Sequence, residues 1–257
     1  MQSKELKNKP LVEAIFEARW QLQAQAALVN VDPHYKLLLG RFFDQIRTKY
    51  PHHEQLQSAS IPDEFVGYTV QHRFRQEKDG WPLVQIGPGI VTCNETSKYT
   101  WTDFHARANE TARVLFNAYP EPTALKVQSL VLRFINAVEF DHSKNDVLQF
   151  LREKMKVNVA LPNDLFSSSN VGCQPTMFQW QATFPCTSPK SAITLRFATG
   201  TRENSPALVW ETMLQSNADD ADITSPCKIG DWLGGAHHIA DDWFFKLISG
   251  DLERSFQ

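Results

Sequence analysis

The sequence predicts an α+β fold in which an antiparallel sheet, or two abutting sheets, carries helices packed on one face. Two observations lead to this expectation. Several stretches alternate apolar and polar residues with a period of two, which is typical of strands with one buried face. Others repeat apolar residues every three or four positions, which is typical of helices that pack on a sheet. The two kinds of stretch occur twice in the same order: strand, helix, three strands, helix.

The first half, residues 1–123, begins with the clearest alternation. In 11–21, Phe16 and Trp20 share one face with small apolar residues, whereas Glu17 and Arg19 share the other. A helix is then expected to start at Asp32-Pro33, because Asp caps helices and Pro is tolerated in the first turn, and to end at Pro51. The other elements expected in this half are strands at 64–75, 81–87 and 90–99, turns at Asp79-Gly80 and Pro88-Gly89, and a helix at 101–119.

The second half, residues 124–257, opens with the most apolar strand of the chain, at 126–140. The elements expected after it are a helix at 146–155, a loop around Ser167, Ser168 and Ser169, strands at 176–185, 192–201 and 207–215, an acidic loop at 217–224 and a helix at 228–249.

The closing helices of the two halves resemble each other. Both open with a tryptophan, Trp101 or Trp232, and carry a histidine about one turn later, His105 or His237. This parallel suggests a pseudo-duplication within one compact unit, with the first strand of each half near a pseudo-twofold axis. The architecture would resemble the saddle or helix-grip folds, a likeness that fixes no function by itself.

Composition and charge argue against several classes of function. The formal net charge is −3 and the pI is about 6.2, so there is no broad basic surface to indicate nucleic-acid binding. The cysteines have neither the spacing of a zinc site nor that of a compact disulfide framework, and no motif predicts a cofactor. Residues 1–10 lack the apolar core of a signal peptide, and no apolar run approaches the roughly 20 residues that span a bilayer. These features predict a cytoplasmic protein without a membrane segment.

No motif predicts a catalytic or metal-binding residue. The Gly-Pro-Gly segment at 87–89 lacks the pattern of a phosphate-binding loop, and the serine run lacks the context of a nucleophile elbow. His237 and His238 precede Asp241 and Asp242 by four residues, which allows pairing along a helix surface. A metal site would require a further ligand from elsewhere in the chain.

Two polar residues interrupt the apolar strand at 126–140. Arg133 needs a partner there, and Glu13 or Glu17 of the first strand is the expected one if the two strands are neighbours. Alternatively, Arg133 binds an anion or a partner on an exposed sheet face. Asn136 points to the opposite face and is expected to be satisfied by the backbone or by a neighbouring side chain.

The motifs taken together resemble a sporadically distributed, uncharacterised bacterial family of similar length. They are Lys-Pro-Leu-Val-Glu-Ala-Ile-Phe-Glu-Ala-Arg-Trp at 9–20, Trp-Pro-Leu-Val-Gln-Ile-Gly-Pro-Gly-Ile at 81–90, Leu-Arg-Phe-Ile-Asn at 132–136, and a C-terminal Ala-His followed by Trp-Phe-Phe at 243–245. Two departures are mild: the family usually has Pro-Pro before the first strand and Tyr at Phe134. The resemblance implies a mobile or defence-type gene neighbourhood. With Glu17 and Arg19, the candidate binding residues that it marks are Trp81, Gln85, Asn94, Tyr99, Trp101, Arg133, Asn136 and His237.

The function expected is that of a non-enzymatic binding protein, a sensor, adaptor or neutralising subunit in an anti-phage defence or toxin–antitoxin-like system. Its partner would be a protein encoded by a neighbouring gene or a phage component, and homo-oligomers remain open. One alternative is a nucleic-acid- or nucleotide-processing enzyme with Glu17, Arg133, Asn136 and His237 in one cleft. The other is a small-ligand-binding module with its pocket between sheet and helices.

Overall fold

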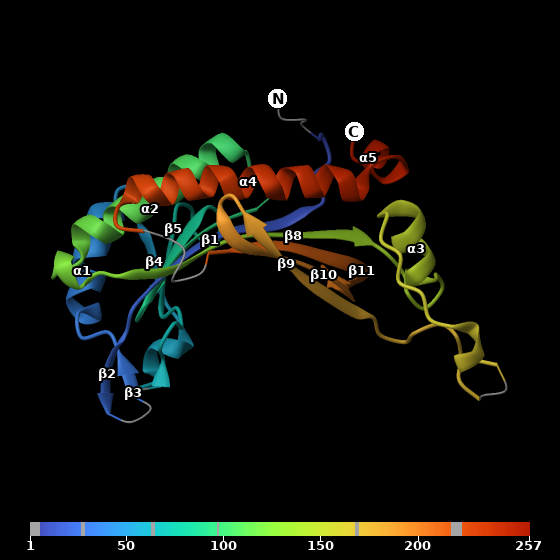
Figure 1. Ribbon diagram of the computed structural model, residues 1–257. Coiled ribbons are helices and arrows are strands. Elements are labelled where there is room, and N and C mark those ends of the chain that lie inside the picture. The colour runs from blue at the N-terminus through green and yellow to red at the C-terminus, as the bar shows by residue number, and fades with distance from the viewer. Residues whose placement is uncertain (1–5, 27–28, 63–64, 97, 168–169, 217–222) are drawn as a thin grey trace.

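A single antiparallel sheet forms the frame of the molecule. The computed structural model describes residues 6–26, 29–62, 65–96, 98–167, 170–216 and 223–257. The strands of the sheet are β1 (Leu11–Trp20), β4 (His52–Gln55), β5 (His72–Arg75), β6 (Leu83–Gly87), β7 (Ile90–Glu95), β8 (Val127–Glu139), β9 (Gln179–Thr187), β10 (Lys190–Arg202) and β11 (Ser205–Gln215). These nine strands lie in the order β4-β5-β6-β7-β1-β8-β11-β10-β9 (Figure 1). Strands β2 (Gln23–Ala26) and β3 (Val29–Val31) form a separate hairpin.

The sheet has the same topology on both sides of its centre. Strands β1 and β8 pair antiparallel in the middle, with Ala14 opposite Phe134. From this pair the order runs outward through β7, β6 and β5 on one side and through β11, β10 and β9 on the other. The expected strand-helix-three-strand-helix order of both halves is therefore present, with β4 and the β2–β3 hairpin added to the first half. The two halves form one continuous sheet, a point that the sequence left open.

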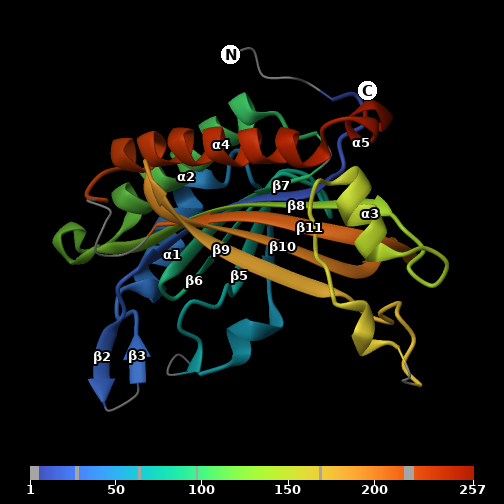
Figure 2. The ribbon, with the colours of Figure 1, turned by 45° about the vertical axis from the view of Figure 1, so that its right-hand side comes forward.

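The helices lie on one face of the sheet (Figures 1 and 2). They are α1 (Tyr35–Ile46), α2 (Trp101–Ala118), α3 (Val147–Lys154), α4 (Pro226–Ile248) and α5 (Asp251–Ser255). The alternation of β1 predicted the face that they cover, since Phe16 and Trp20 are fully buried there. Ser225 and Asp146 cap α4 and α3 with their side chains, which explains where these helices begin.

The apolar core has two parts beneath these helices. The first joins α1, α2 and part of α4 to strands β1, β6 and β7, with Phe42 and Phe104 among its fully buried members. The second joins α3, α5 and the end of α4 to β10 and β11, with Phe197 and Trp210 fully buried. The two clusters meet over the centre of the sheet.

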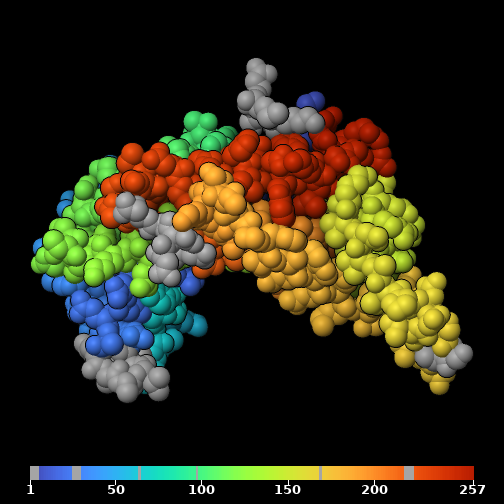
Figure 3. All heavy atoms as spheres, in the orientation of Figure 1, coloured from blue at the N-terminus to red at the C-terminus, as the bar shows by residue number. Residues whose placement is uncertain are grey.

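The opposite face of the sheet, which we call the open face, is not covered by these five α-helices. Two segments extend beyond this face at the two ends of the sheet, so that the molecule has the outline of an arch (Figure 3). We call residues 56–62 and 65–71 the first arm, and residues 157–167 and 170–178 the second arm. The β2–β3 hairpin extends beside the first arm.

Several expected element boundaries were wrong. Only the end of 64–75 is a strand, because the backbone turns at Tyr68, where φ is 61°, and the Tyr68 N–H bonds the Pro88 carbonyl instead of a strand neighbour. His52 begins β4, a strand that the sequence did not predict. The N-cap of α1 is His34, two residues after Asp32, whose carboxylate accepts the Trp20 indole N–H at 2.8 Å and the His34 N–H at 3.0 Å. Residues 168–169 and 217–222 of the expected loops lie outside the described residues.

Candidate functional site

The candidate binding residues divide between the two faces of the sheet. The pairing of β1, β7 and β8 follows strand alternation, so that cross-strand partners point to the same side. The candidates on the open face are Glu17, Arg19, Gln85, Asn94 and Arg133. Trp81 lines a hollow of about 550 Å³. The open-face residue Ile135 lines the same hollow, so Trp81 is grouped with the open-face candidates. The candidates on the helix-covered face are Tyr99, Trp101, Asn136 and His237.

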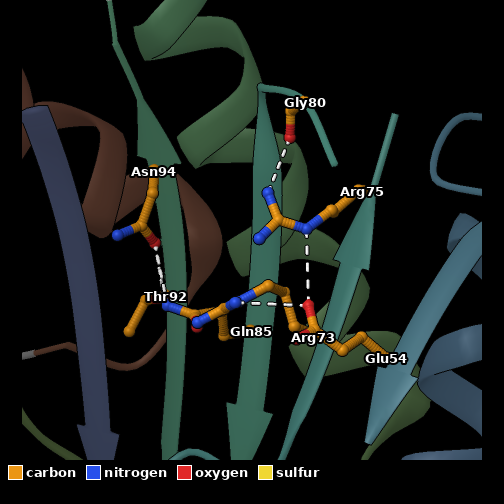
Figure 4. A network of polar contacts seen from close by, with 7 residues as sticks. All are labelled: Glu54, Arg73, Arg75, Gly80, Gln85, Thr92 and Asn94. Atoms are coloured by element: carbon orange, nitrogen blue, oxygen red, sulfur yellow. Dashed lines mark hydrogen bonds and ion pairs between the residues drawn. The ribbon is translucent and has the colours of Figure 1, made fainter. Parts of the chain in front are cut away.

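A chain of polar contacts crosses the first half of the open face (Figure 4). The Glu54 carboxylate of β4 accepts from the Arg73 and Arg75 guanidinium groups of β5 at 3.2 and 3.4 Å. Arg73 Nε donates to Gln85 Oε1 at 2.9 Å, and Gln85 Nε2 donates to Thr92 Oγ1 at 3.2 Å.

The chain of contacts continues into the centre of the sheet. Thr92 Oγ1 donates to Asn94 Oδ1 at 2.7 Å, and Asn94 Nδ2 donates to Glu13 Oε1 at 2.8 Å. Thr92 and Asn94 are only 5% and 4% exposed. The network therefore links β4, β5, β6, β7 and β1 and restrains these side chains.

The second half of the open face corrects the expected partner of Arg133. The Arg133 guanidinium donates to Glu211 of β11 at 2.7 Å, not to Glu13 or Glu17. Met213 stands directly opposite Arg133, which makes Glu211 its diagonal neighbour across the strands. Glu17 instead pairs with Arg19 of its own strand at 2.6 Å.

The arginines of this face are largely neutralised. Arg73, Arg75, Arg19 and Arg133 each lie against a glutamate. Arg196, opposite Glu211 in the sheet register, has a buried Nε with no hydrogen-bond partner among the described residues. The open face thus has little excess positive charge but keeps buried donors available.

Exposed apolar side chains gather on the two arms. Phe65 on the first arm is 78% exposed and Met177 on the second is 76% exposed. Ile61 on the first arm and Leu161, Leu165 and Val171 on the second are also exposed. An apolar group is thus present on each arm, and exposed apolar clusters of this kind mark interaction surfaces.

The helix-covered face holds a pocket where the two apolar clusters meet, which we call the seam pocket. Its volume is about 120 Å³. The lining residues come from the N-terminal segment, the start of α2, the centre of β8 and β11, and α4: Leu6, Lys9, Pro10, Leu11, Tyr99, Thr100, Trp101, Phe134, Asn136, Thr212, His237, Ala240, Asp241, Phe244 and Phe245.

Aromatic rings form much of the seam pocket's wall. The His237 and Trp101 rings stack with centroids 3.7 Å apart and planes 11° from parallel. Tyr99 meets Phe134 edge to face at 5.8 Å, and the Lys9 ammonium donates to the Tyr99 carbonyl at 2.8 Å. Such a wall offers flat apolar area to a ligand.

Several polar groups of the seam pocket have no partner among the described residues. The Tyr99 hydroxyl and Thr212 Oγ1 are buried without a hydrogen bond. The Asn136 side chain, 3% exposed, also lines the pocket. Buried polar groups are normally paired, so these groups are of the kind that a ligand or water satisfies.

Burial controls the ionisation of the pocket's titratable groups. Burial, and then the charges of His105 and His238, lower the pKa of His237 to about 4, so its ring is neutral at pH 7. Burial also raises the pKa of the Asp241 carboxyl, against the opposing effect of His238. No ion pair joins Asp241 to a basic side chain within the described part of the chain.

The expected convergence of Glu17, Arg133, Asn136 and His237 was wrong. Glu17 and Arg133 lie on the open face, whereas Asn136 and His237 line the seam pocket. The helix-surface pairing of His238 with Asp242 is also absent, since Asp242 instead bonds Lys246 at 2.6 Å.

Sequence reasoning missed Lys9 and Thr212 in the pocket, and Glu54 and Arg73 in the network. For Thr212, the only feature of the sequence that could have indicated a site is a hydroxyl on a well-alternating strand.

The described residues contain no group of three or more His, Cys, Asp or Glu side chains placed to hold a metal ion. They also contain no helix with the length and apolarity needed to traverse a bilayer. The sequence matches no protein-family model and no curated protein.

Proposed function

We propose that this protein is a non-enzymatic binding protein that holds a protein partner on its open face. It would act in the cytoplasm as a sensor, adaptor or neutralising subunit of a bacterial anti-phage defence or toxin–antitoxin-like system. The observation that carries the binding role is an uncovered sheet face with a fixed polar network, flanked by exposed apolar side chains on both arms. The biological setting is supported by the motif resemblance alone.

The chemistry of the open face favours a protein over a nucleic acid. Phosphate binding needs arginines and lysines with charge to spare, whereas Arg73 and Arg133 are each paired with a glutamate. Protein interfaces combine a few large apolar anchors with polar groups whose hydrogen bonds are satisfied. Phe65 and Met177 are suited to the first role, and the network from Glu54 to Glu13 is suited to the second.

The partner proposed is a product of an adjacent gene or a phage component, and the arms provide a direct test. Replacing Phe65 and Met177 together with serine is expected to weaken the complex about 30-fold or more, because hot-spot side chains contribute about 2 kcal/mol or more. Both side chains are exposed, so the free energy of unfolding should change by no more than about 0.5 kcal/mol for each. The dissociation constant would be measured by calorimetry with each co-expressed neighbouring gene product.

The matched control is Leu37→Ser. Leu37 is 63% exposed but lies on α1, on the helix-covered side of the sheet. This variant should bind the partner within about threefold of the unchanged protein, which is less than 1 kcal/mol. The proposal fails if neither a neighbouring gene product nor a phage component forms a complex, or if Leu37→Ser weakens the complex as much as the arm variant does.

A further inference from the structure

The seam pocket lies on the opposite side of the sheet from the open face, so whatever occupies it is independent of the proposed partner. It is formed by segments far apart in the sequence, from residues 6–11 to the end of α4. Close packing is the rule in protein interiors, yet here the two apolar clusters leave about 120 Å³ between them.

The size of the pocket indicates a small ligand. A closed apolar cavity of about 150 Å³ accommodates benzene. The seam pocket is slightly smaller, at about 120 Å³, but it is not fully enclosed. It therefore fits a single aromatic ring that carries a small polar substituent.

The polar lining indicates what the substituent carries. Asp241 offers a carboxylate that no described basic residue pairs with, Thr212 offers an unpaired hydroxyl, and Asn136 offers an amide. An ionised Asp241 carboxylate only accepts hydrogen bonds, whereas the Asn136 amide and the Thr212 hydroxyl both accept and donate, so an N–H group is the one ligand donor that all three can satisfy. The aromatic wall that Trp101 and Phe134 provide also favours a planar ring with a delocalised positive charge.

We propose that the seam pocket binds a small planar aromatic ligand of the amidine or aromatic-amine class, with its ring against the aromatic wall and its N–H group at Asp241. Lys9 also lines the pocket, and its ammonium opposes a cationic ligand. The two charged residues therefore make opposite contributions to the affinity.

Benzamidine is the probe, with benzamide as a neutral ligand of the same shape and toluene as an apolar one. Benzamidine is expected to bind with a dissociation constant on the order of 1 mM or lower and at least about tenfold more tightly than benzamide. Titration would be followed in ¹H–¹⁵N correlation spectra, where the Trp101 indole N–H signal reports on the pocket itself.

Two variants with opposite expected effects separate recognition from general damage. Asp241→Asn should weaken benzamidine about tenfold or more and leave benzamide within about threefold, since only the cation loses an ion pair. Lys9→Met should strengthen benzamidine by a few-fold, because it removes the repelling charge. Asp242→Asn is the matched control, since the neighbouring Asp242 bonds Lys246 and does not line the pocket.

Three outcomes would overturn the proposal. They are the absence of shifts near Trp101 with any probe, equal affinity for toluene and benzamidine, and equal losses in Asp241→Asn and Asp242→Asn. If Asp241→Asn fails to fold, Thr212→Val tests the same pocket, since loss of its hydroxyl should weaken benzamidine and benzamide but not toluene. None of these results depends on the protein partner of the open face, so this proposal and the proposed function can fail separately.

Discussion

Replacing Gly87 with alanine is expected to lower the free energy of unfolding by about 3 kcal/mol or more. A Cβ atom at this position would lie 1.9 Å from the Thr69 carbonyl oxygen and 2.9 Å from the Val70 Cα. Both contacts are with backbone, so no change of side-chain rotamer relieves them. The segment around Thr69 would have to move away from β6.

That movement would also break hydrogen bonds on both sides of the contact. The Gln71 N–H donates to the Ile86 carbonyl and the Tyr68 N–H donates to the Pro88 carbonyl, both at 2.9 Å. Each bond contributes about 1 kcal/mol, and a buried group left without its partner costs more. The loss would be measured as a shift in the urea midpoint, followed by tryptophan fluorescence.

Gly40→Ala provides the control for this substitution. Gly40 lies in α1, and a Cβ there would meet nothing within 4 Å. Alanine should stabilise the helix by about 0.5–1 kcal/mol, because it loses less backbone entropy than glycine. Equal urea midpoints for Gly87→Ala and the unchanged protein would contradict the close approach of the two backbones.

The contrast between these glycines shows what the sequence can and cannot predict. The turn at 87–89 follows from its Gly-Pro-Gly composition, and it is confirmed: Gly87 pairs with Ile90, and Gly89 has a φ of 77°. The crowding at Gly87 comes from Thr69, which belongs to a segment that was expected to continue as a strand. Local patterns predict local conformation, whereas this contact depends on how distant segments pack.

The same limit applies to the candidate sites. Alternation along 126–140 correctly predicted that Arg133 and Asn136 point to opposite faces, and this alone argues against one cleft containing both. The partner of Arg133 could not be chosen from the sequence, because β8 pairs with both β1 and β11 and the glutamate that bonds Arg133, Glu211, lies on β11. The seam pocket joins residues from five separate segments, so no spacing within the sequence could predict it.

A second large effect is expected from Arg107→Met, which should lower the free energy of unfolding by about 3–5 kcal/mol. Arg107 of α2 forms an ion pair with Glu95 at the end of β7, and the Glu95 side chain is only 3% exposed. Removal of the guanidinium leaves the Glu95 carboxylate buried. The carboxylate keeps one hydrogen bond to a described residue, from the N–H of the adjacent Thr96 at 3.1 Å. An uncompensated buried charge costs more than the pair itself contributes.

The double variant Arg107→Met, Glu95→Gln should therefore recover most of that loss, since it removes both charges and Gln keeps the shape of Glu95. Arg113→Met on the same helix is the matched control. Arg113 lies 3.7 Å from Glu110 at the surface, where 57% of its side chain is exposed, and such pairs contribute about 0–1 kcal/mol. Urea unfolding at pH 7 would measure all three variants. A double variant as unstable as Arg107→Met alone would show that lost packing by the arginine, and not the unpaired Glu95 carboxylate, causes the destabilisation.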